Sequence, residues 1–215
     1  MNRETEWRDS WPTVLAAFLG VAASAMPSFT LGVMMKPLSD GYGWSRSEIT
    51  SMITIVTIFM LTLSPLIGGL VDRHGARRIV LVACFVLAFG FASLSLAGPA
   101  IWSWYVASAF LGVGMAMAGA TVWISAVARR FHQRRAFALS VALSGLGLSL
   151  GATPALTTAA LGLVGFRHVY FLLAGVAFLC CFPTGLLFFR DAPRAPASRP
   201  GAAAGEHCLR FTEAL

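Results

Sequence analysis

The stretch "GGLVDRHGARRIV", residues 68–80, places one acid, one histidine and three arginines between two long apolar runs. The 215-residue chain around it is 57% hydrophobic and 12% charged, with a mean hydropathy of +0.75. An average globular domain carries about 25% charged residues. We therefore expect most of this chain to lie in a lipid bilayer, and we expect the charged stretch to be a turn outside it.

Six apolar segments are long enough to cross a bilayer as helices, which requires roughly 20 residues each. They run from Trp11 to Met35, Ile49 to Val71, Ile79 to Gly98, Ile101 to Ala128, Ala136 to Leu163 and His168 to Phe189. None contains Asp, Glu, Lys or Arg. The runs are continuous and do not alternate, which favours helices over a barrel. The sequence predicts an all-α polytopic membrane protein with six transmembrane helices.

The basic residues predict the orientation of these helices. Thirteen of the sixteen lie on the side of the N-terminus: Arg3, Arg8, Arg73, Arg77, Arg78, Arg129, Arg130, Arg134, Arg135, Arg190, Arg194, Arg199 and Arg210. The positive-inside rule then places both termini in the cytoplasm. We expect the cell membrane of a bacterium, its inner membrane, as the location. Because the positive charge is distributed by topology, nucleic acid is not an expected partner. The "AASA" at 22–25 resembles a signal-peptidase site, but an acidic tail precedes it and the apolar run continues, so we expect no cleavage.

The charged stretch is expected to be a tight hairpin between the second and third crossings. Gly68 and Gly69 are expected to allow close helix contact. Gly75 is expected to take the left-handed backbone that reverses the chain. Asp72 is expected to accept hydrogen bonds from a helix N-terminus or to pair with a nearby arginine. The arginines of the stretch are expected to anchor the turn at anionic headgroups.

The residue order in this turn resembles a known family motif. It reads Gly68-x-Leu70-x-Asp72-Arg73-x-Gly75-x-Arg77-Arg78, and it resembles the G-x-L-a-D-R-x-G-R-R/K loop between helices 2 and 3 of the major facilitator superfamily. Ala76 stands where a basic residue is common. The resemblance implies that the aspartate and arginines form a cytoplasmic charge network. In the family this network holds the outward-open state and parts during transport.

Other stretches resemble the monocarboxylate and oxalate–formate branch of this family. They are "MKPLSDGYGWSRSEI" at 35–49, "ARRFHQRRAFALSVALSGLGLSLGATPAL" at 128–156 and "GFRHVY" at 165–170. The resemblance covers about residues 12–191. It implies one six-helix bundle made of two inverted three-helix repeats, where family carriers usually have two bundles around a midplane site. We expect a cytoplasmic tail at 1–11, the bundle at 12–189, and a disordered cytoplasmic linker at 190–215.

The resemblance implies that helices 1 and 4, helped by 2 and 5, face the solute cavity. The candidates near mid-membrane are Ser24, Ser28, Thr54, Thr57, Met115, Thr121, Trp123 and Ser144. Some monocarboxylate carriers use a lysine partway along helix 1, whereas Lys36 here lies at its outer end. Arg129 and Arg130 are the nearest candidates to pair with an anion. Their alternative role, shared with Arg134 and Arg135, is to anchor the topology at the cytoplasmic end.

Small residues in the fifth crossing predict close packing. Ser140, Ser144, Gly147 and Gly151 recur at three- and four-residue spacing. Gly145 and Ser149 form a parallel pair. Such strips serve either tight static packing or sliding during a rocking motion. Pro27 and Pro154 are expected to interrupt their helices.

Transport of a small solute is the favoured function, with an organic anion such as a monocarboxylate as substrate and a co-transported proton or an exchanged anion as coupling partner. The chain is expected to be the N-terminal half of a carrier, as a fragment or truncated product. The alternatives are a half-size carrier that works as a dimer and a non-transporting membrane protein. A second six-helix half, downstream or a second copy, is expected to be required for transport. No nucleophile–base set or metal cluster is apparent, so we expect neither an enzyme nor a cofactor.

Overall fold

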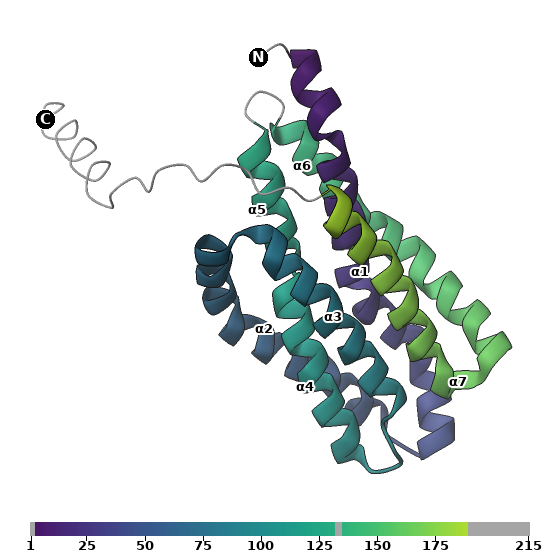
Figure 1. Ribbon diagram of the computed structural model, residues 1–215. Coiled ribbons are helices and arrows are strands. Elements are labelled where there is room, and N and C mark those ends of the chain that lie inside the picture. The colour runs from purple at the N-terminus through teal and green to yellow at the C-terminus, as the bar shows by residue number, and fades with distance from the viewer. Residues whose placement is uncertain (1–2, 132–134, 189–215) are drawn as a thin grey trace, which may run out of the picture.

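The computed structural model describes residues 3–131 and 135–188, and no strand occurs in these ranges (Figure 1). The helices are α1 (Arg3–Tyr42), α2 (Arg46–His74), α3 (Ala76–Ser95), α4 (Ile101–Ala118), α5 (Ala120–Arg130), α6 (Arg135–Leu143) and α7 (Gly145–Phe188). The prediction of an all-helical chain is confirmed.

Six membrane crossings follow from these helices. Five helical stretches are long and apolar enough to span a bilayer, and the last of them, Arg135–Leu186, has 52 residues. At about 1.5 Å per residue such a stretch would measure roughly 78 Å, more than twice the bilayer core. Gly165 lies within it with φ 73° and ψ 163°, which is not a helical conformation. Figure 1 shows α7 turning back there, so its two arms form separate crossings and the predicted six-helix bundle is confirmed.

The helices break at glycine and continue through proline. Gly119, with ψ 153°, separates α4 from α5 within the fourth crossing. Pro27 lies inside α1 and Pro154 inside α7. The prediction that these prolines interrupt their helices is therefore wrong. A proline removes one backbone donor and fixes φ near the helical value, and neighbouring helices can hold the chain in line.

Glycines allow α4 to lie very close to its neighbours. A methyl group added at Gly90 in α3 would lie 2.7 Å from the Cα of Leu111, and one added at Gly114 would lie 2.8 Å from the Cα of Leu87. A methyl group at Gly112 would lie 2.9 Å from the side chain of Phe59 in α2. These distances leave no room for any other residue, so glycine sets the separation of α2, α3 and α4.

The long helix α1 packs against α5, α6 and α7. Gly20 receives the ring of Trp123, which has 1% of its surface exposed. Gly145, at the start of α7, meets the backbone carbonyl of Phe18. A side chain at either glycine would clash, so these contacts fix α1 in the middle of the bundle.

Only one of the two predicted small-residue strips packs within this chain. Gly145 contacts α1, and Ser149 is buried with its hydroxyl 3.0 Å from that of Thr153. Gly147 and Gly151 have nothing within 4 Å of an added methyl group. The strip Ser140–Ser144–Gly147–Gly151 is exposed along its length, so its close packing against a neighbour stays a prediction.

Gly68 and Gly69 give the same result. Both are exposed, and an added methyl group would meet nothing within 4 Å. They contact no helix among the described residues, so their role in close helix contact stays a prediction. The buried positions of α2 are Ile49, Met52, Val56, Ile67 and Val71. These form a single stripe, and the glycines lie on the other side of the helix.

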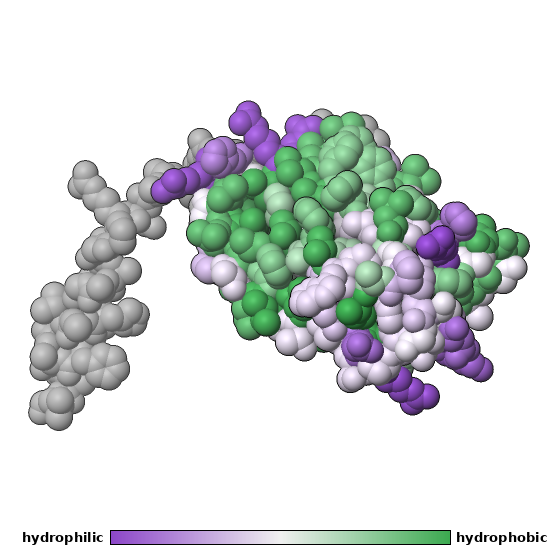
Figure 2. Space-filling model, turned by 90° about the horizontal axis from the view of Figure 1, so that it is seen from below, coloured by the Kyte–Doolittle hydropathy of each residue, from purple (hydrophilic) through white to green (hydrophobic). Residues whose placement is uncertain are grey.

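The three turns opposite the Gly75 turn are joined by hydrogen bonds. The Tyr42 hydroxyl donates to the carbonyl of Ala97 at 3.1 Å and accepts from Nε of Arg167 at 3.2 Å. Nε1 of Trp44 donates to the carbonyl of Pro99 at 3.0 Å. We call this the outer end and the Gly75 end the inner end. Figure 2 looks onto the outer end, where a pale, weakly polar surface bears hydrophilic side chains at its rim.

Gly145 and Gly147, at the start of α7, provide a matched test of the packing of α7 against α1. Gly145→Ala should lower the free energy of unfolding by about 1–3 kcal/mol, because the new methyl group overlaps the α1 backbone. Gly147→Ala should leave stability unchanged or raise it by up to about 1 kcal/mol, because alanine is the better helix former. Thermal and denaturant unfolding in detergent micelles would measure both, and equal effects would contradict the packing.

Candidate functional site

The motif turn between α2 and α3 is built on one glycine. Gly75 has φ 86° and ψ 148°, and its N–H donates to the carbonyl of Val71 at 3.0 Å. Residues with a Cβ rarely adopt such a φ. The positive φ predicted for Gly75 is therefore confirmed, and it allows α3 to begin at Ala76, directly after α2 ends at His74.

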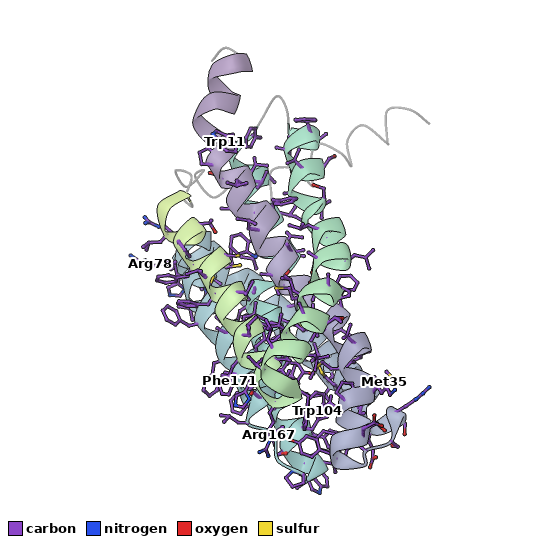
Figure 3. The ribbon with its side chains drawn as sticks, turned by 90° about the vertical axis from the view of Figure 1, so that its right-hand side faces the viewer. Trp11, Met35, Arg78, Trp104, Arg167 and Phe171 are labelled. Carbon is purple, nitrogen blue, oxygen red and sulfur yellow. The ribbon has the colours of Figure 1, made fainter. Side chains whose placement is uncertain are left out.

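The three motif arginines differ in their exposure to solvent and in their contacts. Arg73 and Arg78 are exposed. Arg77 is half-buried, and its Nη2 donates to the backbone carbonyl of Leu186 near the end of α7 at 2.9 Å. Figure 3 shows Arg78 at the same end of the molecule as the end of α7. The turn is thus in contact with the last crossing, a contact that the motif pattern did not predict.

Several predicted residues lie partly or wholly outside the described structure. Asp72 is in α2, and Arg129 and Arg130 are in α5, but the described structure does not include their side chains. Arg134 lies outside the described residues altogether, whereas Arg135 begins α6 and is exposed. The charge network of Asp72 therefore stays a prediction. Gly68 and Leu70, the remaining motif positions, are exposed on α2.

Five of the eight cavity candidates are exposed on the bundle: Ser28, Thr54, Thr57, Thr121 and Ser144. Two of these hydroxyls bond to their own helix, Thr57 to the carbonyl of Ile53 at 2.7 Å and Ser144 to that of Val141 at 2.7 Å. Hydroxyls in helices commonly bond this way. Among the described residues, the hydroxyls of the other three make no such bond, so their donors are available to a ligand.

The other three candidates are buried inside the bundle. Ser24 donates its hydroxyl to the carbonyl of Val21 at 2.9 Å. Met115 has 9% of its surface exposed. Trp123 fills the space left by Gly20, and its Nε1 donates to the carbonyl of Ala118 at 2.9 Å. In this structure these side chains are placed to pack helices together and do not reach the bundle surface.

The exposed hydroxyls lie at different depths. Gly20 contacts Trp123, so Thr121 is at about the level of Gly20 in α1. Ser28 is eight residues further along α1, about 12 Å toward the outer end. Thr57 lies beside the contact of Gly112 with Val56 and Phe59. Ser28 and Thr121 therefore lie at different depths along the bundle, and the position of the candidates near mid-membrane stays a prediction.

Sequence reasoning missed a polar stripe on α2. Thr50, Thr54, Thr57, Leu61, Ser64 and Gly68 follow at alternating four- and three-residue spacing. All except the half-buried Thr50 are exposed. Residues at this spacing share one face of a helix. The spacing alone would have identified Ser64 and Thr50 as companions of the two threonines already named.

The described residues contain no group of three or more His, Cys, Asp or Glu side chains able to hold a metal ion. No charged residue occurs in the six apolar segments. The arrangement is a helical membrane bundle with exposed hydroxyls distributed between its two ends and a basic turn at one end. These features define the class as a polytopic membrane protein with the architecture of a carrier bundle.

The chain belongs to the Major Facilitator Superfamily, whose sequence profile matches residues 17–215. It is 22% identical to bovine (Bos taurus) monocarboxylate transporter 1 over 177 residues, which are 82% of this chain and 35% of that protein. It is 25% identical to mouse (Mus musculus) monocarboxylate transporter 6 over 186 residues, 86% of this chain and 39% of that protein. The predicted family and its monocarboxylate branch are confirmed, and proteins of this family are transporters and not enzymes.

A further relative and a solved structure agree. Human (Homo sapiens) monocarboxylate transporter 11 is 28% identical over 200 residues, 91% of this chain and 42% of that protein. The crystal structure of a peptide transporter POT (E310Q mutant) in complex with alafosfalin matches with a TM-score of 0.66 at 19% identity, covering 94% of this chain and 45% of that one. This match shows the shared fold. The chain spans about a third of the length of the first curated relatives it matches.

Trp123 and Thr121 in α5 test whether the buried and the exposed candidates contribute differently to the stability of the bundle. Trp123→Ala should lower the free energy of unfolding by about 3–5 kcal/mol, because it leaves a large cavity against Gly20. Thr121→Ala, two residues away and exposed, should change it by no more than about 0.5 kcal/mol. Unfolding in detergent micelles measures both. Equally small losses would show that Trp123 does not hold α1 to α5.

Proposed function

We propose that this chain is one six-helix half of a secondary carrier that moves a small organic anion, such as a monocarboxylate, across the membrane by alternating access. The similarity to monocarboxylate transporters carries the proposal, because it extends over four-fifths or more of the chain. The family match over residues 17–215 includes the helices that bear the exposed hydroxyls. The proposed solute class comes from those relatives.

Two kinds of exposed surface support this assignment. Large hydrophobic residues are exposed on α3, α4 and the second arm of α7, including Phe85, Phe89, Val106, Phe110 and Leu179, and this composition suits contact with lipid. The α2 stripe exposes Thr, Ser and Gly together with Leu61, and the Ser140–Gly162 stripe on α6 and α7 exposes Ser, Thr, Gly and Ala among exposed leucines such as Leu150 and Leu163. Small and hydroxyl residues are typical of helix–helix contacts and of water-filled cavities in membranes.

The stripe on α6 and α7 is as regular as that on α2. It consists of Ser140, Ser144, Gly147, Gly151, Ala155, Thr158 and Gly162, all exposed. Its length matches a full crossing. We propose that this stripe and the α2 stripe receive the helices of a second six-helix half. Alternating access requires two such bundles around one site.

The exposed hydroxyls with available donors provide the solute contacts of this half. Ser28, Thr54 and Thr121 have donors available, and a carboxylate accepts hydrogen bonds from such groups. Their spacing from the inner to the outer end suits a path better than a single closed pocket. We propose that the solute is passed along these donors as the two halves rock.

The proposed orientation places the inner end in the cytoplasm. The described inner end exposes Arg73, Arg78 and Arg135. The outer end carries Lys36, Arg46 and Arg167, balanced in part by Asp40 and Glu48. In the full sequence, thirteen of the sixteen basic residues fall in the segments assigned to this side, as the positive-inside rule expects of a cytoplasmic side. The motif turn then lies at the cytoplasmic gate.

Uptake in proteoliposomes tests the proposal. Radiolabelled lactate should accumulate when the chain is reconstituted with a six-helix partner encoded by adjoining DNA, and not with the chain alone, because one bundle cannot enclose a site. Asp72→Asn in the assembled carrier should reduce the initial rate about tenfold, the effect of losing one charge-assisted hydrogen bond.

Asp40→Asn is the matched control, since it makes the same chemical change at the outer end and should leave the rate near that of the wild type. If the chain and its six-helix partner take up lactate at the same rate with Asp72→Asn as without it, the gating role is contradicted. Absence of lactate uptake in every combination, with the protein folded, would instead contradict the proposed solute.

The stripe on α7 can be tested separately from the fold. Gly147→Leu should abolish association with the second half, and uptake with it, because a bulky side chain would separate two close helices. Gly175→Leu, on the second arm of α7, should affect neither. Both glycines are exposed with nothing within 4 Å of an added methyl group, so the chain should fold in both variants. Co-purification of the two halves measures association, and equal binding by both variants would contradict the interface.

A further inference from the structure

Helix α3 and the second arm of α7 are joined by side-chain bonds at both ends. At the inner end Nη2 of Arg77 donates to the carbonyl of Leu186 at 2.9 Å. At the outer end the Ser95 hydroxyl donates to the carbonyl of Arg167. In each case a side chain of α3 bonds to the backbone of the other helix. The two bonds therefore hold the helices in a fixed register along the crossing.

Aromatic rings join the same two helices between these bonds. The ring of Phe85 lies 5.0 Å from that of Phe178 and 5.1 Å from that of Phe182, edge to face with both. Near the inner end, a methyl group added at Gly185 would lie 3.4 Å from Cγ1 of Val80. The backbone of α7 thus lies within van der Waals reach of α3, close to the carbonyl that Arg77 binds.

The bond between Arg77 and Leu186 lies near the end of α7, where the helix dipole favours a positive charge. The last carbonyls of a helix have no donor within the helix and carry the negative end of its dipole. Leu186 is two residues before the last described residue of α7, Phe188. A guanidinium is well suited to such a carbonyl, because it provides both charge and directed N–H groups. Arg77 therefore occupies the position of a C-terminal cap supplied by another helix.

We propose that Arg77 is a positioning residue that fastens the inner end of the last crossing to the motif turn. Arg77 is the second residue of α3, directly beyond Gly75 and Ala76. Any displacement of the turn is therefore transmitted to the end of α7, from which the chain continues to residue 189. This role is distinct from carrying positive charge at the membrane surface, and it does not depend on which solute is transported.

Arg78 provides the contrast. It carries the same charge at the next position, it is exposed, and it makes no hydrogen bond among the described residues. Figure 3 places it at the same end of the molecule as the end of α7. A role in topology alone would make the two arginines equivalent. The fastening role requires Arg77 and not Arg78.

Hydrogen exchange of the full chain in lipid nanodiscs tests the proposal. In Arg77→Gln, the amides of residues 182–188 should exchange roughly tenfold faster than in the wild type, since a charged hydrogen bond is lost from the last turn. In Arg78→Gln they should exchange at the wild-type rate. Equal acceleration in both variants would overturn the proposal in favour of a general charge effect, and no change in Arg77→Gln would overturn it outright.

A second pair keeps the test usable if Arg77→Gln does not fold. Arg77→Lys and Arg78→Lys both retain the charge and so the topology. The ammonium of lysine has no planar fork of donors, so Arg77→Lys should still accelerate exchange at residues 182–188 relative to Arg78→Lys. Equal rates in this pair would also overturn the proposal. The readout involves no solute, so it is independent of the outcome of the uptake experiments.

Discussion

Close backbone contact at glycine is the constraint on which this bundle depends. Lipid tails are as apolar as leucine, so the hydrophobic effect does not drive helices together inside a membrane as it does in water. What remains is van der Waals packing, which is strongest where backbones approach closely. Gly90, Gly112 and Gly114 set the α2–α3–α4 contacts, and Gly20 and Gly145 set those of α1. The bonds between turns at the outer end then fix the helices relative to one another.

The same residue type has a second use where it is exposed. Gly147 and Gly151 lie in the same crossing as Gly145 but face away from the bundle. With Ser140, Ser144 and Thr158 they form a stripe of small side chains that lies among exposed leucines such as Leu150 and Leu163. The α2 stripe likewise combines exposed hydroxyls with Leu61, which has 72% of its surface exposed. Small side chains at these positions allow a further helix to approach closely.

The sequence predicted the features that the membrane itself imposes. Six spans, their helical form and the reversal at Gly75 follow from segment length, backbone hydrogen bonding and the special freedom of glycine. It did not predict which of two adjacent strips on α7 meets α1, because Gly145 and Gly147 obey the same spacing rule. It also did not separate Thr121 from Trp123. Which of two neighbours is buried depends on the rotation of the helix after the break at Gly119, and no local pattern encodes that angle.

The absence of charge from the six spans constrains how an organic anion could be carried. Moving a carboxylate from water into a medium of low dielectric constant costs several kcal/mol even after relaxation. A neutral hydroxyl bond returns only about 1 kcal/mol net. The donors of Ser28, Thr54 and Thr121 lie at different depths, so the solute cannot use all three at once. Hydroxyls alone therefore cannot hold the charged form at mid-membrane. Either the second half supplies a cation opposite this path, or the solute crosses as its protonated, neutral form.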